Sequence, residues 1–210
     1  MTRYRIGYVD ENQDEFKKFE RALRDNFELV PYKIEKGLPL SELMDRIYQS
    51  GVDMLLIDFL MVDSGLVTFN GDDVAREYEK IKPRFPMLIF TNEEKQAFPQ
   101  VDDPTMIYTK NQTDMTHFAA ILTRSIENYQ NQIQKHKDTL NNLLEKGEKQ
   151  GLTAEERHTV LSTQLDLKNY DKRSVEVPFQ LLDEKKLDDI SKTRKEAEEY
   201  LKSLLDKNKK

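Results

Sequence analysis

Hydrophobic and polar residues follow two different periods along the first 123 residues. Segments with apolar residues every three or four positions, typical of a helix with one buried face, separate short apolar runs of strand length. The helical segments begin near Asn12, Leu40, Gly71 and Asp114. The strand-like runs are residues 5–9, 28–34, 53–57, 86–90 and 106–109. Repeated strand-then-helix units of this size predict an α/β fold with a doubly wound, five-stranded parallel sheet.

Local signals refine several of these elements. Asn12 precedes the first helix as an N-cap, with Glu15 three residues later in the spacing of a capping box. The run 53–57 is apolar at almost every position, which favours a strand that is covered on both faces. Pro99 and Pro104 interrupt the segment after the fourth run, so we expect the helix there to be short.

Beyond residue 114 the strand pattern nearly disappears and a heptad-like seam replaces it. Gly147 and Gly151 bracket the end of this seam. An apolar stripe on a polar helix must pack against a partner, which is either the chain's own tail in an antiparallel hairpin or a second chain in a homodimer. The seam positions are Phe118, Leu122, Ile126, Tyr129, Ile133, His136, Leu140 and Leu143.

The rest of the tail predicts two more helices. Thr153 and Glu156 have the spacing of a capping box at the start of a helix over residues 153–170. Residues 174–179 predict a linker that contains a proline. Residues 181–205 predict a last helix with its own stripe of apolar positions three and four apart.

The chain therefore divides into two parts, which differ in charge. Residues 1–123, the α/β domain, carry 15 Lys and Arg against 22 Asp and Glu, a net charge of −7. Residues 124–210, an all-α, coiled-coil-like extension, carry 18 against 17, a net charge of +1. Neither part has the clustered positive charge of a nucleic-acid-binding surface, so nucleic acid is disfavoured as a partner.

Composition argues against several other classes. The chain has no cysteine, which removes disulfides and thiolate chemistry and favours a reducing, cytoplasmic compartment. Its longest aliphatic run, residues 54–57, is far shorter than the roughly 20 apolar residues of a membrane-spanning helix. Acids at Asp10 and Glu11 stand where a signal peptide would have its apolar region.

Polar residues follow most of the strand-like runs. Asp10 and Glu11 come after the first run, Asp58 after the third, Thr91 after the fourth and Lys110 after the fifth. The carboxyl ends of neighbouring parallel strands meet at one edge of a sheet, which is where such sheets bind their ligands. We therefore expect these side chains to converge, although they are remote from one another in the sequence.

The order of these runs and of their polar ends resembles a response-regulator receiver domain of two-component signalling. The resemblance covers about residues 1–125, in the stretches RIGYVDEN, VDMLLIDFLM, GDDVAREYEK, FPMLIFTN and IYTK. It implies a flavodoxin-like fold in which Asp58 is the phosphoacceptor and Thr91 and Lys110 assist the transfer. It also implies a histidine kinase or a phosphotransfer protein as the phosphoryl donor, and a further protein as the target.

Elementary electrostatics adds a metal ion to this site. Three carboxylates in one pocket repel one another, and a hard divalent cation with oxygen ligands removes that conflict. We expect Mg²⁺ at Glu11 and Asp58, with Asp10 bound directly or through water and a backbone carbonyl near Leu60. Mg²⁺ and Lys110 would neutralise charge while Asp58 becomes an aspartyl phosphate. Enzymatic activity would be limited to this self-phosphorylation and to autodephosphorylation.

Several positions depart from the family pattern. Val62 replaces a usual proline, residues 63–70 lengthen the loop after Asp58, and Asn92 is bulkier than the small residue common there. Ile107 stands where a switch aromatic often lies. These departures leave a second interpretation open, a phosphorylation-independent pseudo-receiver that acts as a scaffold or adaptor.

Other chemistries fit less well. No Gly-rich phosphate-binding loop is present, and Asp58-Phe-Leu lacks the second acid of a haloacid-dehalogenase phosphatase. His136 and His158 lie on the helical tail without the flanking motif of a phosphotransfer histidine. The leading hypothesis is a response-regulator-like protein that accepts a phosphoryl group on Asp58 and controls protein–protein interaction through its helical tail.

Overall fold

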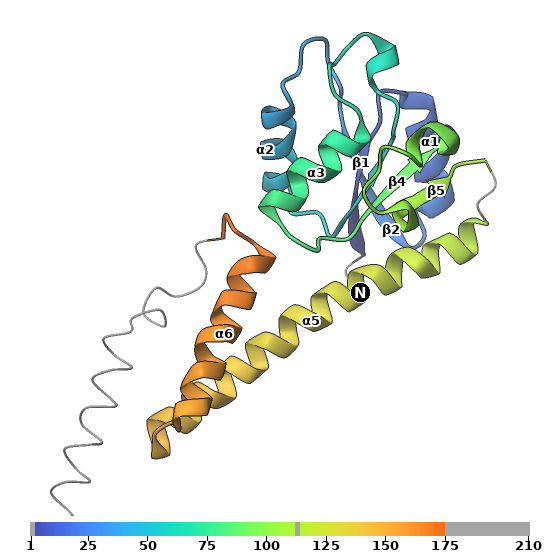
Figure 1. The fold of residues 1–210 in the computed structure, drawn as a ribbon. Helices are drawn as coiled ribbons and strands as arrows, with labels where there is room; N and C mark the ends of the chain where they lie inside the picture. The colour runs from blue at the N-terminus through green and yellow to red at the C-terminus, as the bar shows by residue number, and fades with distance from the viewer. Residues whose placement is uncertain (1–2, 112–113, 175–210) are drawn as a thin grey trace, which may run out of the picture. The chain divides into compact units, whose positions relative to one another are not determined.

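The computed structural model describes residues 3–111 and 114–174 of the chain (Figure 1). The described residues form two compact units, divided between residues 131 and 132. The last helix expected at 181–205, and nearly all of the linker before it, lie outside the described residues. Among the residues that are described, none of the helices has both the length and the apolar character needed to cross a bilayer.

The first unit is built on a five-stranded parallel sheet. Its strands are β1 (Tyr4–Val9), β2 (Phe27–Tyr32), β3 (Met54–Ile57), β4 (Met87–Thr91) and β5 (Ile107–Thr109). Their order, β2-β1-β3-β4-β5, is the doubly wound, flavodoxin-like order, which confirms the expected fold. The winding reverses between β1 and β3, so the carboxyl ends of these two strands border the crevice in which such sheets bind ligands.

Helices alternate with the strands and begin close to the positions that the sequence predicts. They are α1 (Gln13–Leu23), α2 (Leu40–Ser50), α3 (Gly71–Ile81), α4 (Glu94–Ala97), α5 (Met115–Gln150) and α6 (Ala154–Tyr170), with short 3₁₀ turns at Val62–Ser64 and Pro104–Met106. The side chain of Asn12 caps α1, because it accepts hydrogen bonds from the backbone N–H groups of Asp14 and Glu15 at 3.0 and 3.2 Å. As expected from Pro99 and Pro104, α4 has only four residues.

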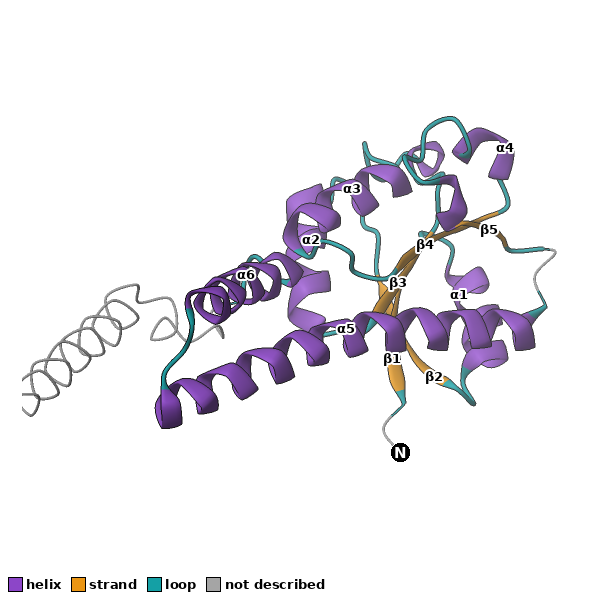
Figure 2. Cartoon of the chain, turned by 60° about the horizontal axis from the view of Figure 1, so that its bottom comes forward, coloured by secondary structure: helices purple, strands orange, loops and turns teal. Residues whose placement is uncertain are grey.

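Two helices cover each face of the sheet (Figure 2). Side chains along a strand alternate between the two cores: Leu55 and Ile57 pack with α2 and α3, whereas Met54 and Leu56 pack with α1 and the first turns of α5. All four residues of β3 are buried, which confirms that this solid apolar run is covered on both faces.

In the second unit, the end of α5 and α6 form an antiparallel hairpin. The hydroxyl of Tyr170 donates a hydrogen bond to Oε1 of Gln132 at 2.9 Å, and Nδ1 of His136 lies 4.0 Å from Oδ2 of Asp166. Later residues of α5 thus lie against earlier residues of α6, as in an antiparallel pair. The small apolar core of the hairpin consists of Leu140, Leu152 and Val160.

The turn of this hairpin lies where the sequence predicts it. α5 ends at Gln150, between Gly147 and Gly151, and Gly151, with a φ of 75°, follows its last residue. Thr153 and Glu156 form the expected capping box: Oγ1 of Thr153 accepts from the N–H of Glu156 at 3.2 Å, and the N–H of Thr153 donates to Oε2 of Glu156 at 3.0 Å.

The heptad-like seam is divided between the two units. Phe118, Leu122 and Ile126 belong to a core of the sheet. Leu140 and Leu143 pack instead in the hairpin. Within the described part of the chain, the seam is therefore not one continuous coiled-coil surface, and α6 of the same chain covers its second half.

The start of α3 lies against the segment that follows β3. A Cβ atom on Gly71 would lie 2.2 Å from the carbonyl oxygen of Asp58. The N–H of Gly71 donates to the carbonyl oxygen of Phe59 at 2.8 Å. The close approach of two backbones, rather than an unusual φ, requires glycine at this position.

We predict that Gly71→Ala lowers the free energy of unfolding by about 1–3 kcal/mol, because the backbone after β3 must move, although alanine is the better helix former. The matched change is Gly147→Ala, where the nearest atom is Cγ of the flexible Leu152 side chain at 3.1 Å. That variant should be neutral or slightly stabilising. Urea denaturation followed by circular dichroism measures both, and equal effects would contradict the prediction.

Candidate functional site

The side chains that follow β1, β3 and β5 converge at one edge of the sheet. Lys110 donates hydrogen bonds from Nζ to Oδ2 of Asp10 at 2.7 Å and to Oδ1 of Asp58 at 2.6 Å. The exposed fractions of the three side chains are only 4%, 2% and 12%, respectively, so the ion pairs are largely removed from water. The structure thus brings together three of the residues that the sequence placed in one site.

Asp10 receives hydrogen bonds from two further donors. The backbone N–H of Asn12 donates to Oδ1 at 2.7 Å, and the hydroxyl of Tyr8 donates to Oδ2 at 3.1 Å. Burial raises the pKa of the Tyr8 hydroxyl, and the charge of Asp10 adds to this shift, so the hydroxyl keeps its proton at neutral pH. Tyr8 is not among the site residues that the sequence predicts; the signal that points to it is its place in β1, two residues before Asp10, since side chains two positions apart along extended backbone face the same side.

Polar contacts close the loop that follows Asp58. The N–H of Leu60 donates to Oδ2 of Asp58 at 3.1 Å. Further along, Oδ1 of Asn70 accepts hydrogen bonds from the N–H groups of Met61 and Val62 at 3.1 and 3.0 Å. These bonds join the end of the long loop to its beginning. Buried apolar side chains also anchor this loop: Phe59, Met61, Val67 and Phe69.

Thr91 is buried at the end of β4, but its hydroxyl makes a local contact. Oγ1 accepts a hydrogen bond from the N–H of Glu93 at 3.1 Å. The backbone N–H of Lys110 donates to the carbonyl oxygen of Thr91 at 3.0 Å, which places the two residues on neighbouring strand ends. Among the described residues, the Thr91 hydroxyl has no hydrogen bond to Asp10 or Asp58, so the structure does not place it directly on the acidic cluster.

Burial and charge shift the titration of these groups. Burial raises the pKa of Glu11, a backbone hydrogen bond opposes the shift, and the charges of Asp10 and Asp58 add to it. Burial also raises the pKa of Asp58, although Lys110 opposes this. Burial lowers the pKa of Lys110, but the two carboxylates more than compensate, so the pKa lies above its usual value and the ammonium is charged at neutral pH. The ionised cluster carries a surplus of negative charge.

The oxygen atoms of the cluster are of the kind that Mg²⁺ binds, but they are not arranged as a metal site. Oε2 of Glu11 is buried without a hydrogen-bond partner, and the candidate ligands are all oxygens, as Mg²⁺ prefers. Within the described ranges, however, no three His, Cys, Asp or Glu side chains are grouped so that they could hold a metal ion. Lys110 already engages one oxygen each of Asp10 and Asp58. A Mg²⁺ ion here would therefore need water for much of its coordination.

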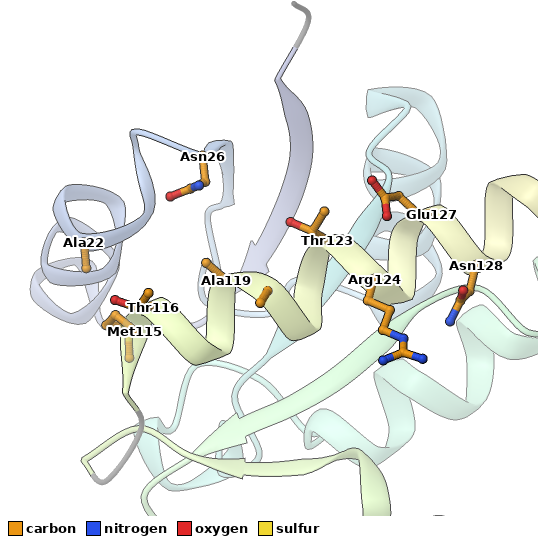
Figure 3. Close-up of a pocket in the computed structure, with 10 residues that line it drawn as sticks. Ala22, Asn26, Met115, Thr116, Ala119, Thr123, Arg124, Glu127 and Asn128 are labelled. Atoms are coloured by element: carbon orange, nitrogen blue, oxygen red, sulfur yellow. The ribbon is translucent and has the colours of Figure 1, made fainter.

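Cavities also lie away from this cluster. One of about 640 Å³ lies between the end of α1 and the first turns of α5, and small and polar side chains such as Ala22, Ala119 and Arg124 line it (Figure 3). Another of about 610 Å³ lies between α3 and the segment after the short α4, with Met87 and Val101 in its lining. None of the expected site residues lines either cavity, so the acidic cluster is a separate feature.

Comparisons with known proteins give a likeness to solved structures alone. No family model matches the sequence, and no curated protein matches it. A response regulator receiver domain protein (CheY-like) from Methanospirillum hungatei is similar at 14% identity and a TM-score of 0.44, over 60% of this chain and 96% of that one. An adenylate cyclase from Rhodopirellula baltica is similar at 18% identity and a TM-score of 0.49, over 65% and 96% of the two chains. These similarities do not assign a function.

We predict that neutralising the two acids changes stability in opposite directions in metal-free buffer at neutral pH. Asp58→Asn should raise the melting temperature, because burial penalises the ionised form that the folded protein carries above its raised pKa. Asp10→Asn should lower the free energy of unfolding by about 3 kcal/mol, because it removes the charge that a buried ammonium and two further donors compensate.

Thermal and chemical denaturation of the two variants beside the wild type measure both effects. A melting temperature of Asp58→Asn at or below that of the wild type would contradict the first expectation. An Asp10→Asn variant with the same free energy of unfolding as the wild type would contradict the second expectation.

Proposed function

We propose that this chain is a response-regulator-like signalling protein whose Asp58 accepts a phosphoryl group from a histidine kinase or a phosphotransfer protein. The observation that carries the proposal is the buried ammonium of Lys110, 2.6 Å from Asp58 and 2.7 Å from Asp10, at the carboxyl edge of a doubly wound sheet. A fixed cation beside the accepting oxygen can stabilise the charge on a phosphoryl group during transfer. The motif resemblance of the strand ends supports the same assignment.

The transfer would form one bond and break another. A carboxylate oxygen of Asp58 attacks the phosphorus in line, the P–N bond of a phosphohistidine breaks, and the departing imidazole nitrogen takes a proton from solvent. Lys110 donates to the phosphoryl oxygens, while Asp10 keeps the ammonium charged and in place. The hydroxyl of Thr91, whose oxygen accepts from the N–H of Glu93, would donate its proton to a phosphoryl oxygen.

Mg²⁺ fits this proposal as the cofactor. Glu11, Asp58 and a backbone carbonyl near Leu60 would hold it, with Asp10 bound directly or through water. The bound ion would supply further positive charge opposite the phosphoryl oxygens. The unpartnered oxygen of Glu11 and the surplus negative charge of the cluster support this assignment.

We further propose that phosphorylation controls protein–protein interaction through the helical tail. The new group adds roughly −1.5 to −2 charges to a cluster that is already negative, so hydrogen bonds around it must rearrange. α5 starts soon after β5 and spans the boundary between the two units, which makes it the element through which such a change would reach the hairpin. The tail's partner would be a downstream protein or a second copy of the chain, and the cysteine-free composition supports the cytoplasm as the compartment.

One observation favours a second candidate, a phosphorylation-independent pseudo-receiver that serves as a scaffold or adaptor. Both carboxylate oxygens of Asp58 already accept hydrogen bonds, Oδ1 from Lys110 and Oδ2 from the N–H of Leu60. The ammonium thus neutralises part of the acidic cluster without a metal. The two candidates differ in whether Asp58 reacts.

We predict that Mg²⁺ and a small phosphodonor such as phosphoramidate add one phosphoryl group to the intact mass of the wild-type protein. Asp58→Asn should gain none, because the nucleophile is missing. The matched control is Asp63→Asn, which changes an exposed acid in the same loop and should be phosphorylated like the wild type. An unchanged mass of the wild type at saturating donor would contradict the proposal and favour the pseudo-receiver.

Beryllofluoride with Mg²⁺ separates the two candidates without a transfer step. In a receiver, the mixture raises the melting temperature of the wild type and leaves that of Asp58→Asn unchanged. In a pseudo-receiver it changes neither. Light scattering on the same samples reports whether occupation of the site alters the assembly state.

A further inference from the structure

The side chain of Tyr8 connects the apolar core of the sheet with the acidic cluster. Its ring packs near those of Phe16 and Phe19, with centroid distances of 5.8 and 6.2 Å, and the residue is 2% exposed. Its hydroxyl lies at the polar end of this packing, 3.1 Å from Oδ2 of Asp10. A rigid ring thus holds a hydrogen-bond donor at a fixed point beside the cluster.

The donors around Asp10 define the orientation of its carboxylate. Oδ1 accepts from the N–H of Asn12 at 2.7 Å, and Oδ2 accepts from Tyr8 at 3.1 Å and from Lys110 at 2.7 Å. The backbone donor fixes one oxygen and the phenol fixes the other. Without the phenol, Lys110 would be the sole remaining donor on Oδ2 among the residues that the structure describes, and the carboxylate could turn with the flexible lysine stem.

We propose that Tyr8 is a positioning residue of the phosphoacceptor site, whose hydroxyl fixes Asp10 so that Asp10 in turn holds the ammonium of Lys110 against Asp58. The inference rests on the proposed function, and it assigns to Tyr8 no contact with the phosphoryl group. It acts through Asp10 and Lys110. Its effect follows from geometry, since an ammonium that strays from the accepting oxygen stabilises the transferring group less.

Tyr32 provides a matched control for the loss of a buried phenol. It is 6% exposed on β2, and its hydroxyl lies 2.5 Å from Oγ of Ser50, in the core on the other face of the sheet. Tyr8→Phe and Tyr32→Phe each remove one hydroxyl and its hydrogen bond, which is buried for Tyr8 and partly buried for Tyr32, while the ring stays. A purely structural role for Tyr8 therefore predicts that the two variants behave alike.

The test combines a kinetic and a spectroscopic measurement on the full chain. With phosphoramidate and Mg²⁺ at saturation, Tyr8→Phe should lower the phosphorylation rate constant roughly tenfold, the effect of losing one hydrogen bond to a charged group, and Tyr32→Phe should stay within about twofold of the wild type. In metal-free protein labelled with ¹⁵N-lysine, the Lys110 ammonium, assigned by its absence in Lys110→Arg, should exchange its protons about tenfold faster in Tyr8→Phe and at the wild-type rate in Tyr32→Phe.

Each outcome decides the proposal. Equal ammonium exchange in Tyr8→Phe and Tyr32→Phe would overturn it, and so would faster exchange in Tyr8→Phe with an unchanged phosphorylation rate constant. If the wild type takes up no phosphoryl group at all, the proposed function fails. The exchange measurement in metal-free protein then still decides whether Tyr8 positions Asp10 and Lys110.

Discussion

A buried ammonium between two carboxylates is the interaction on which the candidate site depends. Removing such charges from water costs several kcal/mol per ion, and good geometry with additional hydrogen bonds is needed to offset this. Asp10 meets that condition with its three donors. The strand order explains why the cation is a lysine: the side chain starts after β5 and must reach past β4 to the ends of β3 and β1, which a long, flexible stem can do.

Most of the fold follows from the period of the apolar positions. The alternating side chains of β3 and the stripes of the helices specify two covered faces, and Pro99 and Pro104 foretell the short α4. Gly147 and Gly151 bracket the end of α5, as the pattern predicts. The seam beyond residue 114 shows the limit of such patterns, because a hydrophobic period indicates that a stripe is buried and does not indicate what covers it.

The site was less fully predictable. Topology placed Asp10, Asp58 and Lys110 at one edge of the sheet, because the ends of parallel strands meet there. The individual contacts depend on side-chain rotamers and loop paths, which no spacing encodes. Tyr8 was missed because an aromatic residue in a strand looks like ordinary core. Asn70 was missed because the bonds that close its loop join backbone groups eight and nine residues away.

Two of the groups that orient the acids belong to the main chain. The amide of Asn12 contacts Asp10, and the amide of Leu60 contacts Asp58. Any amino acid other than proline supplies the same amide. A substitution at position 60 can therefore change the side chain and preserve the hydrogen bond to Asp58. Two sequences that differ at this position can share the same geometry around the acid, and sequence identity does not record that. A proline at position 12 or 60 would remove the amide hydrogen bond, although in a sequence comparison it counts as one substitution like any other.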